Sequence, residues 1–349
     1  MKTEIFKINR YKFQKEELLA PAEAIRNGML VAFPTETVYG LGANALNSAA
    51  CDAVFEAKGR PHDNPLIVHI LNPQDALKYA NVDNEPLFWK LAEKFMPGPL
   101  TVILPKKSII PDAVTVGLST VALRCPNHPV ARALIEMSGV PIAAPSANLS
   151  GKPSPTAAEH VIEDMTGRIP MIIDSGACDV GLESTVISLK NGVVRLLRPG
   201  YVTYEDLKEI CPVVEISPAV LENLSVDDKP ESPGMKYRHY APTAPVTMVR
   251  GEEAKVLSFL RKALDDGCGV LCFDEDAKIL LSEKQNPNLI CFGSKENLLS
   301  QANGLFDALR RFDTLNVNKI YARYTQQDHL GLAISNRLLR ACAFDLLDL

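Results

Sequence analysis

The 349-residue chain lacks any run of about 18 consecutive apolar residues, the length that a membrane-spanning helix needs. Its start, Met1–Glu4, lacks the apolar stretch of a signal peptide. Tryptophan occurs once and aromatic residues make up 6% of the chain, yet 46% of the residues are hydrophobic, which excludes wholesale disorder, collagen and coiled coil. We therefore expect a globular cytoplasmic protein without membrane contact, and at roughly 150 residues per domain the length predicts two domains.

The eight cysteines form no recognisable metal or disulfide pattern. No CxxC pair occurs, and no cysteine–histidine cluster has the spacing of a structural zinc site. Most cysteines lie in apolar surroundings, as Cys272 does between Val270 and Phe273. We expect buried free thiols in a reducing compartment.

A strong excess of one charge is also absent. Residues 1–200 carry 20 basic and 20 acidic side chains, and residues 201–349 carry 17 and 22, so the net charge of −5 lies in the C-terminal part. The neutral N-terminal part argues against a polyanion-binding surface over the whole molecule. It leaves room for a local basic pocket that binds a small anion.

Short apolar runs alternate with helical periodicity through the first 210 residues, which predicts an α/β domain on a mixed sheet. The predicted strands are Met29–Phe33, Leu66–Ile70, Leu100–Leu104, Thr120–Arg124, Pro141–Ala144, Met171–Ile173, Ser184–Leu189 and Val193–Leu197. Helices are predicted over Glu16–Arg26, Ala49–Lys58, Pro86–Phe95, His128–Ser138 and Ala157–Met165. The tight turn Lys190–Gly192 makes the last two strands an antiparallel hairpin and argues against a purely parallel sheet.

A polar, proline-containing segment divides the chain. Asp227–Gly234 has no periodicity, and the neighbouring Met235–Tyr240 is rich in aromatic and cationic residues for a spacer. Strands at 246–249, 269–273, 288–292 and 319–321 then alternate with helices at 252–264, 295–312 and 328–341. We predict a first domain over residues 1–212, a linker over 213–245 and a small α/β domain over 246–349.

Residues 33–45 form the first stretch that suggests binding chemistry. They contain a GxGxxA pattern that begins at Gly40, but the glycines lie seven residues beyond the end of the strand, so the match to a dinucleotide fingerprint is weak. We interpret the stretch as a loop that presents Thr35, Thr37 and backbone amides to a ligand. A tightly packed turn that needs glycine is the alternative.

The second stretch follows a predicted helix and ends at His69. Lys58, Arg60 and Asn64 suit triphosphate binding because they combine a mobile charge, a planar guanidinium and a neutral donor. Alternatively, Lys58 and Arg60 complement the negative end of the helix. His69 ends an apolar strand and is either a core histidine or a substrate contact.

The third stretch, Ala143–Thr156, combines small hydroxyl and amide residues with a predicted N-cap at Thr156. Such loops let oxyanions approach the backbone, although a simple turn with a cap is the alternative. No GxSxG elbow, phosphate-binding GxxxxGK[ST] loop or HExxH pair is present. Serine–histidine hydrolysis is therefore disfavoured, and a nucleotide would bind outside the standard motifs.

Taken together, these stretches resemble the YrdC-like family of threonylcarbamoyl-AMP synthases. The matching segments are PTETVYGLGANA at 34–45, KGRPHDNPLIVH at 58–69, PGPLT at 97–101, APSANLSG at 144–151, ESTV at 183–186, RPG at 198–200 and SPGMKYRHYAP at 232–242. The last segment, followed by another hundred residues, resembles the longer two-domain form. The resemblance implies a twisted, mixed open sheet with a concave basic pocket, plus a smaller Rossmann-like α/β domain.

The reaction implied by the resemblance joins L-threonine, bicarbonate or CO2, and ATP into L-threonylcarbamoyladenylate, with release of pyrophosphate. The product would serve the tRNA threonylcarbamoyl-transferase machinery, which modifies adenosine beside the anticodon. Mg2+ is expected with ATP, and its ligands are not indicated by the motifs. Direct RNA binding and a non-catalytic interaction role are the alternatives; no arginine-rich tract or aromatic RNA-reading motif favours more than a weak RNA contact.

The resemblance also implies site residues. The catalytic K-x-R…S-x-N signature corresponds to Lys58, Arg60, Ser146 and Asn148. ATP would be bound by Arg60, Asn64, Thr120, Ser146, Ser154, Arg198 and Tyr237, the last closing over the nucleotide as part of a linker lid. L-Threonine would be bound by Thr37, His69, Arg124, Ala144 and Ser184, with Arg124 as the partner of its carboxylate.

Overall fold

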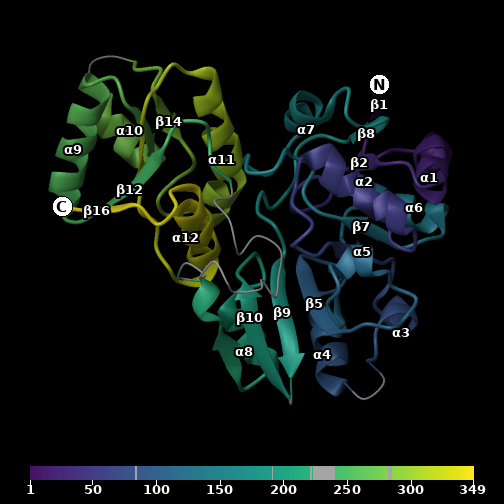
Figure 1. The fold of residues 1–349 in the computed structure, drawn as a ribbon. Coiled ribbons are helices and arrows are strands. Elements are labelled where there is room, and N and C mark those ends of the chain that lie inside the picture. The colour runs from purple at the N-terminus through teal and green to yellow at the C-terminus, as the bar shows by residue number, and fades with distance from the viewer. Residues whose placement is uncertain (83–84, 191, 221, 223–239, 282–284) are drawn as a thin grey trace.

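The computed structural model describes residues 1–82, 85–190, 192–220, 222, 240–281 and 285–349. Two sheets, each with its own helices, make up two lobes that meet along α11 and α12 (Figure 1). The larger sheet is mixed and the smaller one is parallel, which confirms the predicted α/β class with a second, smaller α/β unit. The boundary predicted at residue 212 stays a prediction.

The larger sheet has eleven strands in the order β1-β8-β2-β3-β7-β4-β6-β5-β9-β10-β11. Their bounds are β1 Glu4–Lys7, β2 Val31–Phe33, β3 Gly40–Asn44, β4 Ile67–His69, β5 Leu100–Pro105, β6 Thr120–Arg124, β7 Ile142–Ala144, β8 Met171–Asp174, β9 Thr185–Lys190, β10 Val193–Arg198 and β11 Val214–Ile216. The hairpin of β9 and β10 is antiparallel as predicted, and Gly192 takes a φ of +75° in its turn. Val214–Ile216, predicted as linker, pairs with β10 as an edge strand.

Strand β3 was predicted as a loop, and this prediction is wrong. The strand pairs with β2 and β7 in the middle of the sheet. A Cβ on Gly42 would lie 2.9 Å from the Phe33 ring and from Ile142, and one on Gly40 would lie 3.2 Å from the same ring. These glycines therefore serve close packing inside a strand.

The helices of the first lobe surround this sheet. Their bounds are α1 Leu19–Arg26, α2 Ser48–Lys58, α3 Ala76–Tyr79, α4 Pro86–Phe95, α5 Asp112–Thr115, α6 Pro129–Ser138, α7 Ala158–Met165 and α8 Tyr204–Ile210, with 3-10 turns at Lys15–Leu18, Pro73–Asp75 and Pro218–Val220. The predicted cap at Thr156 is wrong, because α7 begins at Ala158 with Ala157 at the N-cap. The other predicted helices lie within two or three residues of the observed ones.

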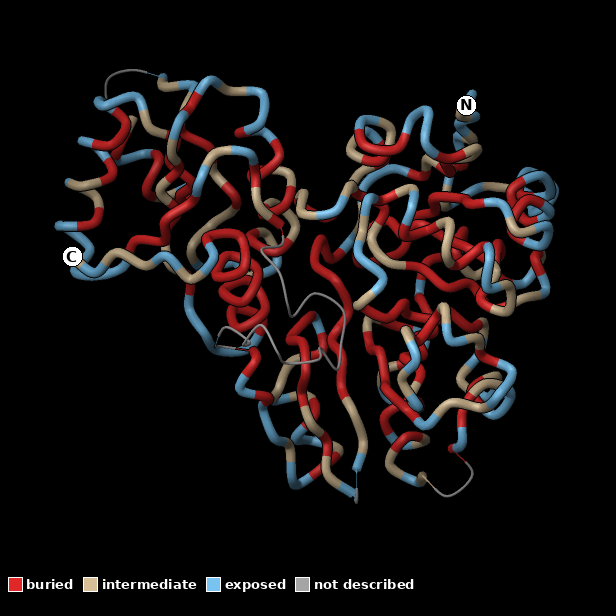
Figure 2. Tube along the Cα trace, in the orientation of Figure 1, coloured by how far each residue is buried: buried red, intermediate tan, exposed pale blue. Residues whose placement is uncertain are grey.

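The strands of the larger sheet are largely buried (Figure 2), and the buried residues on its two faces belong to different clusters. Val68, Leu123 and Ala143 belong to the main core, together with residues of α2 and α4. Because side chains alternate along a strand and directly paired residues share a face, Ile67, His69, Arg124 and Ala144 point to the opposite face. That opposite face carries the cavity described below.

The smaller sheet has the order β14-β13-β15-β12-β16. Its strands are β12 Val246–Arg250, β13 Gly269–Cys272, β14 Leu289–Cys291, β15 Ile320–Arg323 and β16 Leu346–Asp348, and its helices are α9 Glu253–Asp265, α10 Asp274–Leu280, α11 Leu298–Arg311 and α12 His329–Ala341, with a 3-10 turn at Phe312–Thr314. Helices α9 and α10 cover one face, and α11 and α12 cover the other. This doubly covered parallel sheet confirms the expected Rossmann-like unit.

Helices α11 and α12 join the two lobes through buried polar contacts. On α12, Asn336 Nδ2 donates to the Val220 carbonyl at 2.6 Å, and Arg340 Nη2 donates to the Ala219 carbonyl at 2.6 Å. On α11, Arg310 Nη2 donates to Asp164 Oδ2 at 2.7 Å and to the Pro153 carbonyl at 2.6 Å. The second unit is thus docked on the loops that surround the cavity of the first.

None of the helices in the described part of the chain is long and apolar enough to cross a bilayer. All eight cysteines are free, as predicted, and five of them are buried.

Candidate active site

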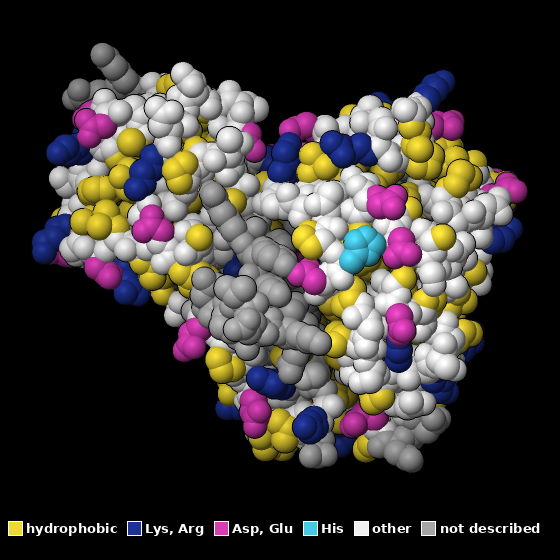
Figure 3. Space-filling model, in the orientation of Figure 1, with side chains coloured by type: hydrophobic (Ala, Val, Ile, Leu, Met, Phe, Trp, Pro, Cys, Tyr) yellow, Lys and Arg dark blue, Asp and Glu magenta, His cyan; other side chains and the backbone are white. Residues whose placement is uncertain are grey.

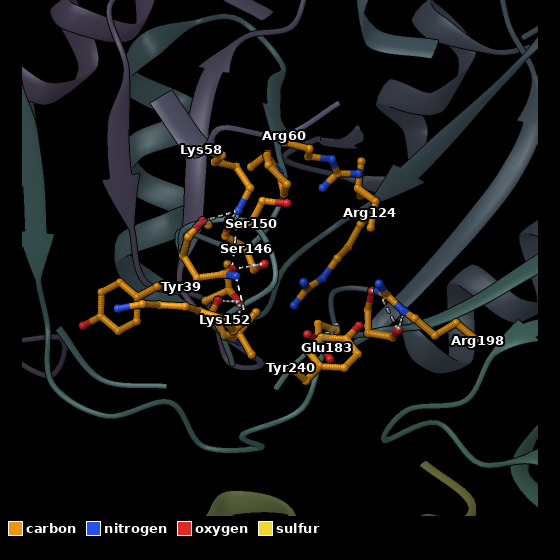
Figure 4. Close-up of a pocket in the computed structure, with 18 of the residues that line it drawn as sticks. Tyr39, Lys58, Arg60, Arg124, Ser146, Ser150, Lys152, Glu183, Arg198 and Tyr240 are labelled. Carbon is orange, nitrogen blue, oxygen red and sulfur yellow. Dashed lines mark hydrogen bonds between the residues drawn. The ribbon is translucent and has the colours of Figure 1, made fainter. Parts of the chain in front are cut away.

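A cavity of about 770 Å³, including space open to solvent, lies on the face of the larger sheet that carries His69 and Arg124 (Figure 4). Five cationic side chains and one carboxylate line it: Lys58, Arg60, Arg124, Lys152, Arg198 and Glu183. The predicted site residues His69, Ala144, Ser146, Asn148 and Ser184 also line it. The neutral first domain therefore concentrates positive charge at one place, as the sequence predicted.

Lys58, at the end of α2, holds the loop that follows β7. Its Nζ donates to the carbonyls of Ser146 and Asn148, both at 2.5 Å. Ser146 Oγ donates to Asn148 Oδ1 at 2.5 Å, while Asn148 Nδ2 donates to the Leu149 and Lys152 carbonyls. Burial and the nearby Arg60 hold the pKa of Lys58 well below its ordinary value. The signature residues Lys58, Ser146 and Asn148 thus form one hydrogen-bonded unit.

Arg60 follows the helix end at Gly59, which has a φ of +60° and turns the chain toward the cavity. Its Nη2 donates to the Asn64 carbonyl at 3.0 Å. Burial lowers the pKa of Arg60 to about 10, so the guanidinium remains charged at neutral pH. The cation is available to an anion in the cavity.

Paired strands place His69 beside Arg124. His69 Nδ1 lies 3.2 Å from the Ile142 carbonyl, and burial together with the Arg124 charge lowers the pKa of His69 to about 3. The imidazole is therefore neutral at neutral pH, with Nδ1 as the donor to the Ile142 carbonyl. Arg124 Nη2 lies 2.8 Å from Glu36 Oε1, and Arg124 Nε has no hydrogen-bond partner among the described residues. This buried N–H is free to bind a ligand carboxylate.

Arg198, at the end of β10, forms hydrogen bonds with Ser184, the residue that precedes β9. Its Nε and Nη2 donate to the Ser184 carbonyl at 3.1 and 3.0 Å, and Nη2 donates to Ser184 Oγ at 3.2 Å. Ser184 Oγ also lies 2.7 Å from Thr101 Oγ1. Burial lowers the pKa of Arg198 to about 10. On the side of the cavity opposite Lys58 and Ser146, Arg198 and Arg124 lie near each other (Figure 4).

The carboxylate of Glu183 links the cavity to the second lobe. Arg337 of α12, fully buried, donates from Nε to Glu183 Oε2 at 2.8 Å, and Ser154 Oγ donates to Glu183 Oε1. Burial disfavours the charged carboxylate, but Arg337, Arg198 and the Ser154 hydrogen bond outweigh it and hold the pKa of Glu183 below its ordinary value. The Arg337 guanidinium also lies 5.7 Å from the ring centre of Tyr240, which lines the cavity.

Four predicted site residues do not line the cavity. Three of them contact a residue that does line it. Thr37 Oγ1 lies 2.9 Å from Thr35 Oγ1, the Asn64 carbonyl accepts a hydrogen bond from Arg60, and Ser154 donates to Glu183. Thr120 begins β6 and lines a small separate cavity, four residues from Arg124. Its predicted contact with ATP gains no support from this placement and stays a prediction. Tyr237 lies outside the described residues.

The charged and aromatic residues around the cavity that had no role in the sequence analysis include Lys152, Glu36, Glu183, Tyr240 and Arg337. Glu36 lies in the first binding stretch, but its partner Arg124 is 88 positions further along the chain. Glu183 pairs with Arg337, which belongs to the second lobe. Tyr240 belongs to the aromatic–cationic segment and could have been selected from it. For Arg337, the sequence carried no signal.

Among the described residues, no group of three or more histidine, cysteine or acidic side chains could hold a metal ion. Glu183 is the one carboxylate among the described residues that line the cavity, and it is already bonded to Arg337 and Ser154. The donor set therefore fits an ion that is bound chiefly by substrate phosphates and water.

Comparisons with known proteins agree with this geometry. A family model described as telomere recombination (Sua5_yciO_yrdC) matches residues 23–200, and one described as threonylcarbamoyl-AMP synthase, C-terminal domain (Sua5_C) matches residues 202–343. The chain belongs to the threonylcarbamoyl-AMP synthase family. It is 45% identical over 331 residues to the Bacillus subtilis threonylcarbamoyl-AMP synthase, with 93% of this chain and 92% of the relative covered.

An archaeal relative extends this likeness to the three-dimensional structure. The Pyrococcus abyssi threonylcarbamoyl-AMP synthase is 45% identical over 338 residues, with 96% of each chain covered. The crystal structure of P. abyssi Sua5 complexed with L-threonine has a TM-score of 0.91 and 41% identity, and covers 99% of this chain and 100% of that one. The likeness includes both lobes, which confirms the two-domain form of the family.

Proposed function

We propose that this protein is a threonylcarbamoyl-AMP synthase that makes L-threonylcarbamoyladenylate from L-threonine, bicarbonate or CO2, and ATP. The threonine amine forms an N–C bond either with CO2, losing a proton, or with bicarbonate, whose C–OH bond breaks so that water leaves. An oxygen of the resulting carbamate then forms a P–O bond with the α-phosphorus of ATP, and the bond to pyrophosphate breaks. The observation that carries the proposal is a cavity rich in cations, in a chain that matches the family over nearly its full length.

The amino acid would bind at the end of the cavity formed by His69 and Arg124. The free Nε–H of Arg124 suits the threonine carboxylate, since a charged donor and acceptor form the stronger kind of hydrogen bond. Glu36 holds the guanidinium in position. A neutral His69 adds no charge that would repel the ammonium group of threonine. Thr37, Ala144 and Ser184 would complete this end.

The nucleotide would bind across Arg60, Ser146 and Arg198. The positive charge of Arg60 and Arg198 would stabilise the negative charge that develops on the phosphates as pyrophosphate leaves, and Ser146 would add a hydroxyl. Two N–H groups of Lys58 donate to the carbonyls of Ser146 and Asn148, so we assign Lys58 to the positioning of these two residues. Asn64 and Ser154 would act from just behind the lining, and Tyr237 would close over the nucleotide from the linker.

Mg2+ would accompany ATP and help to neutralise the triphosphate charge. The product would pass to the enzymes that transfer the threonylcarbamoyl group to tRNA in the cytoplasm. On the face shown in Figure 3, cationic and acidic side chains are interspersed, which does not favour a broad RNA-binding surface there.

Pyrophosphate release tests the proposal. Incubated with ATP, bicarbonate and Mg2+, the protein should release pyrophosphate only when L-threonine is present. Arg60→Ala should abolish release, whereas Arg168→Ala, a change at an exposed arginine outside the cavity lining, should retain it. Release that does not depend on threonine, or full activity of Arg60→Ala, would contradict the assignment.

A further inference from the structure

A second cavity, of about 560 Å³ including space open to solvent, lies in the C-terminal unit at the carboxyl ends of strands β12, β13 and β15. It is lined by Arg250, Gly251, Glu253, Phe273, Lys295, Leu298, Gln301, Arg323, Tyr324 and Gln326. None of these residues lines the first cavity.

The topology of the sheet explains why a crevice forms there. From β12 the chain passes through α9 toward β13 and the β14 edge, whereas from β15 it passes through α12 toward the β16 edge. Strands β12 and β15 are parallel neighbours, and the connections that leave them run in opposite directions along the sheet. Because such crossovers are right-handed, α9 and α12 lie on opposite faces of the sheet. Open α/β sheets bind ligands at the carboxyl ends of such a strand pair. Arg250 and Arg323, which end β12 and β15, lie at this point.

A residue of the lining, Gln301, carries a buried acceptor without a partner among the described residues. Gln301 on α11 is 1% exposed, and its Nε2 donates to the carbonyls of Ser294 at 2.8 Å and Lys295 at 3.1 Å. Its Oε1 has no hydrogen-bond partner in the described part of the chain. A buried acceptor is costly unless it is satisfied, so the site is built for a ligand that supplies an N–H or O–H group.

Cations outnumber carboxylates among the lining residues, although each cation is already paired with a carboxylate in or behind the lining. Arg250, Lys295 and Arg323 outnumber the single carboxylate Glu253. Arg323 is buried and bonded to Glu253 Oε2 at 2.8 Å and to Asp276 Oδ2 at 2.8 Å. Two of the cations lie at the more exposed rim, where Lys295 Nζ is 3.2 Å from Glu253 Oε1 and Arg250 pairs with Asp348. Cations at a partly open rim can bind a phosphate without losing their existing partners.

Two aromatic rings complete the crevice. The Arg323 guanidinium lies 5.5 Å from the Phe273 ring centre, and that of Arg250 lies 5.7 Å from the Tyr324 ring centre. Phe273 is 4% exposed and packs against Phe292, so the half-buried Tyr324 ring is the aromatic surface that a planar base can contact. The buried acceptor suits an amino or hydroxyl group of a nucleoside, and the rim cations suit its phosphate.

We propose that this crevice is a second binding site, specific for a nucleoside monophosphate and separate from the first cavity. Arg250 and Lys295 contact the phosphate, and Gln301 Oε1 accepts from an amino or hydroxyl group of the nucleoside. The proposal does not depend on the synthase reaction, because it uses no residue of the first cavity.

Calorimetric titration of the full chain with AMP tests this site. The wild-type protein should show a binding event that Arg250→Ala and Lys295→Ala each weaken about tenfold, as expected for loss of one charge-assisted hydrogen bond. Lys262→Ala is the matched control, because Lys262 is an exposed cation of α9 outside the crevice. Gln301→Met, similar in length but without an acceptor, should weaken the same event.

Variation of the ligand and of the first cavity completes the test. The event should persist in Arg60→Ala, and inorganic phosphate should bind at least about tenfold more weakly than AMP because it lacks the base and sugar contacts. The proposal is overturned if AMP binding is unaffected by both rim variants, if Arg60→Ala removes all AMP binding, or if phosphate binds as tightly as AMP. Circular dichroism of each variant verifies that it is folded.

Discussion

The buried ion pair between Arg337 and Glu183 predicts that the C-terminal unit stabilises the wall of the active site. The pair joins α12 to the cavity with an Nε–Oε2 distance of 2.8 Å, and the Arg337 side chain is 0% exposed while that of Glu183 is 8% exposed. Removing Arg337 leaves the buried Glu183 carboxylate with Ser154 and the nearby Arg198 but without its ion-pair partner, which costs up to about 3–5 kcal/mol. Arg337→Met should therefore lower the free energy of unfolding of the first domain by about that amount.

A double-mutant cycle distinguishes the pair from general loss of packing. Glu183→Gln removes the charge while keeping a side chain of similar shape. The double variant leaves neither charge buried without its partner. Its loss of unfolding free energy should therefore be smaller than the sum of the two single losses by about 2 kcal/mol or more. Arg311→Met, an exposed arginine one helix away, should change stability by less than about 0.5 kcal/mol.

Trp89 allows the unfolding of the first lobe to be followed separately from that of the second. It is the one tryptophan of the chain and lies on α4 in the first lobe, so its fluorescence during urea unfolding reports that lobe. The KM for ATP should rise in Arg337→Met, because Glu183 and Ser184 form the wall of the cavity. Simple additivity of the two single variants would refute the proposed coupling.

Three further predictions concern the first cavity. Arg124→Gln should raise the KM for L-threonine about tenfold or more with a smaller effect on the KM for ATP, since it removes a charged hydrogen bond to the carboxylate; steady-state kinetics in both substrates would refute this if the ATP value changed more. His69 has a folded-state pKa of about 3, below the ordinary 6.5, so only the unfolded state takes up its proton between these values, and stability falls as pH decreases through this window. His69→Gln should therefore flatten the fall in unfolding free energy between pH 6 and 4 by about 1.4 kcal/mol per pH unit, and an unchanged slope in urea titrations would contradict the assignment. Lys58→Met should release the Ser146 loop, so that amide hydrogen exchange in that loop accelerates and pyrophosphate release falls at least about 100-fold; slow exchange in the loop together with full activity would exclude the positioning role.

The strand pattern of the first domain was predictable because apolar runs of three to six residues mark most buried strands. Strand β3 was not, because its sequence GLGAN has the composition of a turn. Its glycines are needed for the approach of the Phe33 ring, which is a tertiary contact and leaves no local signal. The first residue of α7 was misplaced for a related reason: Thr156 has the right chemistry for a cap, but its backbone N–H instead donates to His160 Nδ1.

The cationic groups of the site were predictable from motifs, whereas their partners were not. Lys58 and Arg60 stand in a short segment that suggests anion binding, and Arg124 and Arg198 received their roles through the family resemblance. The carboxylates that hold Arg124 and Arg337 in place become partners only through the fold, at separations of 88 and 154 residues. The nucleotide-type crevice of the C-terminal unit arises in the same way, from strands and helices whose sequences carry no motif.

Tracing the carbon of bicarbonate into the product tests the central claim most directly. With [13C]bicarbonate, L-threonine, ATP and Mg2+, mass spectrometry should detect threonylcarbamoyladenylate that carries one 13C, in step with the pyrophosphate released. The same mixture without L-threonine should give neither labelled adenylate nor pyrophosphate. Pyrophosphate release with no labelled adenylate would contradict the account.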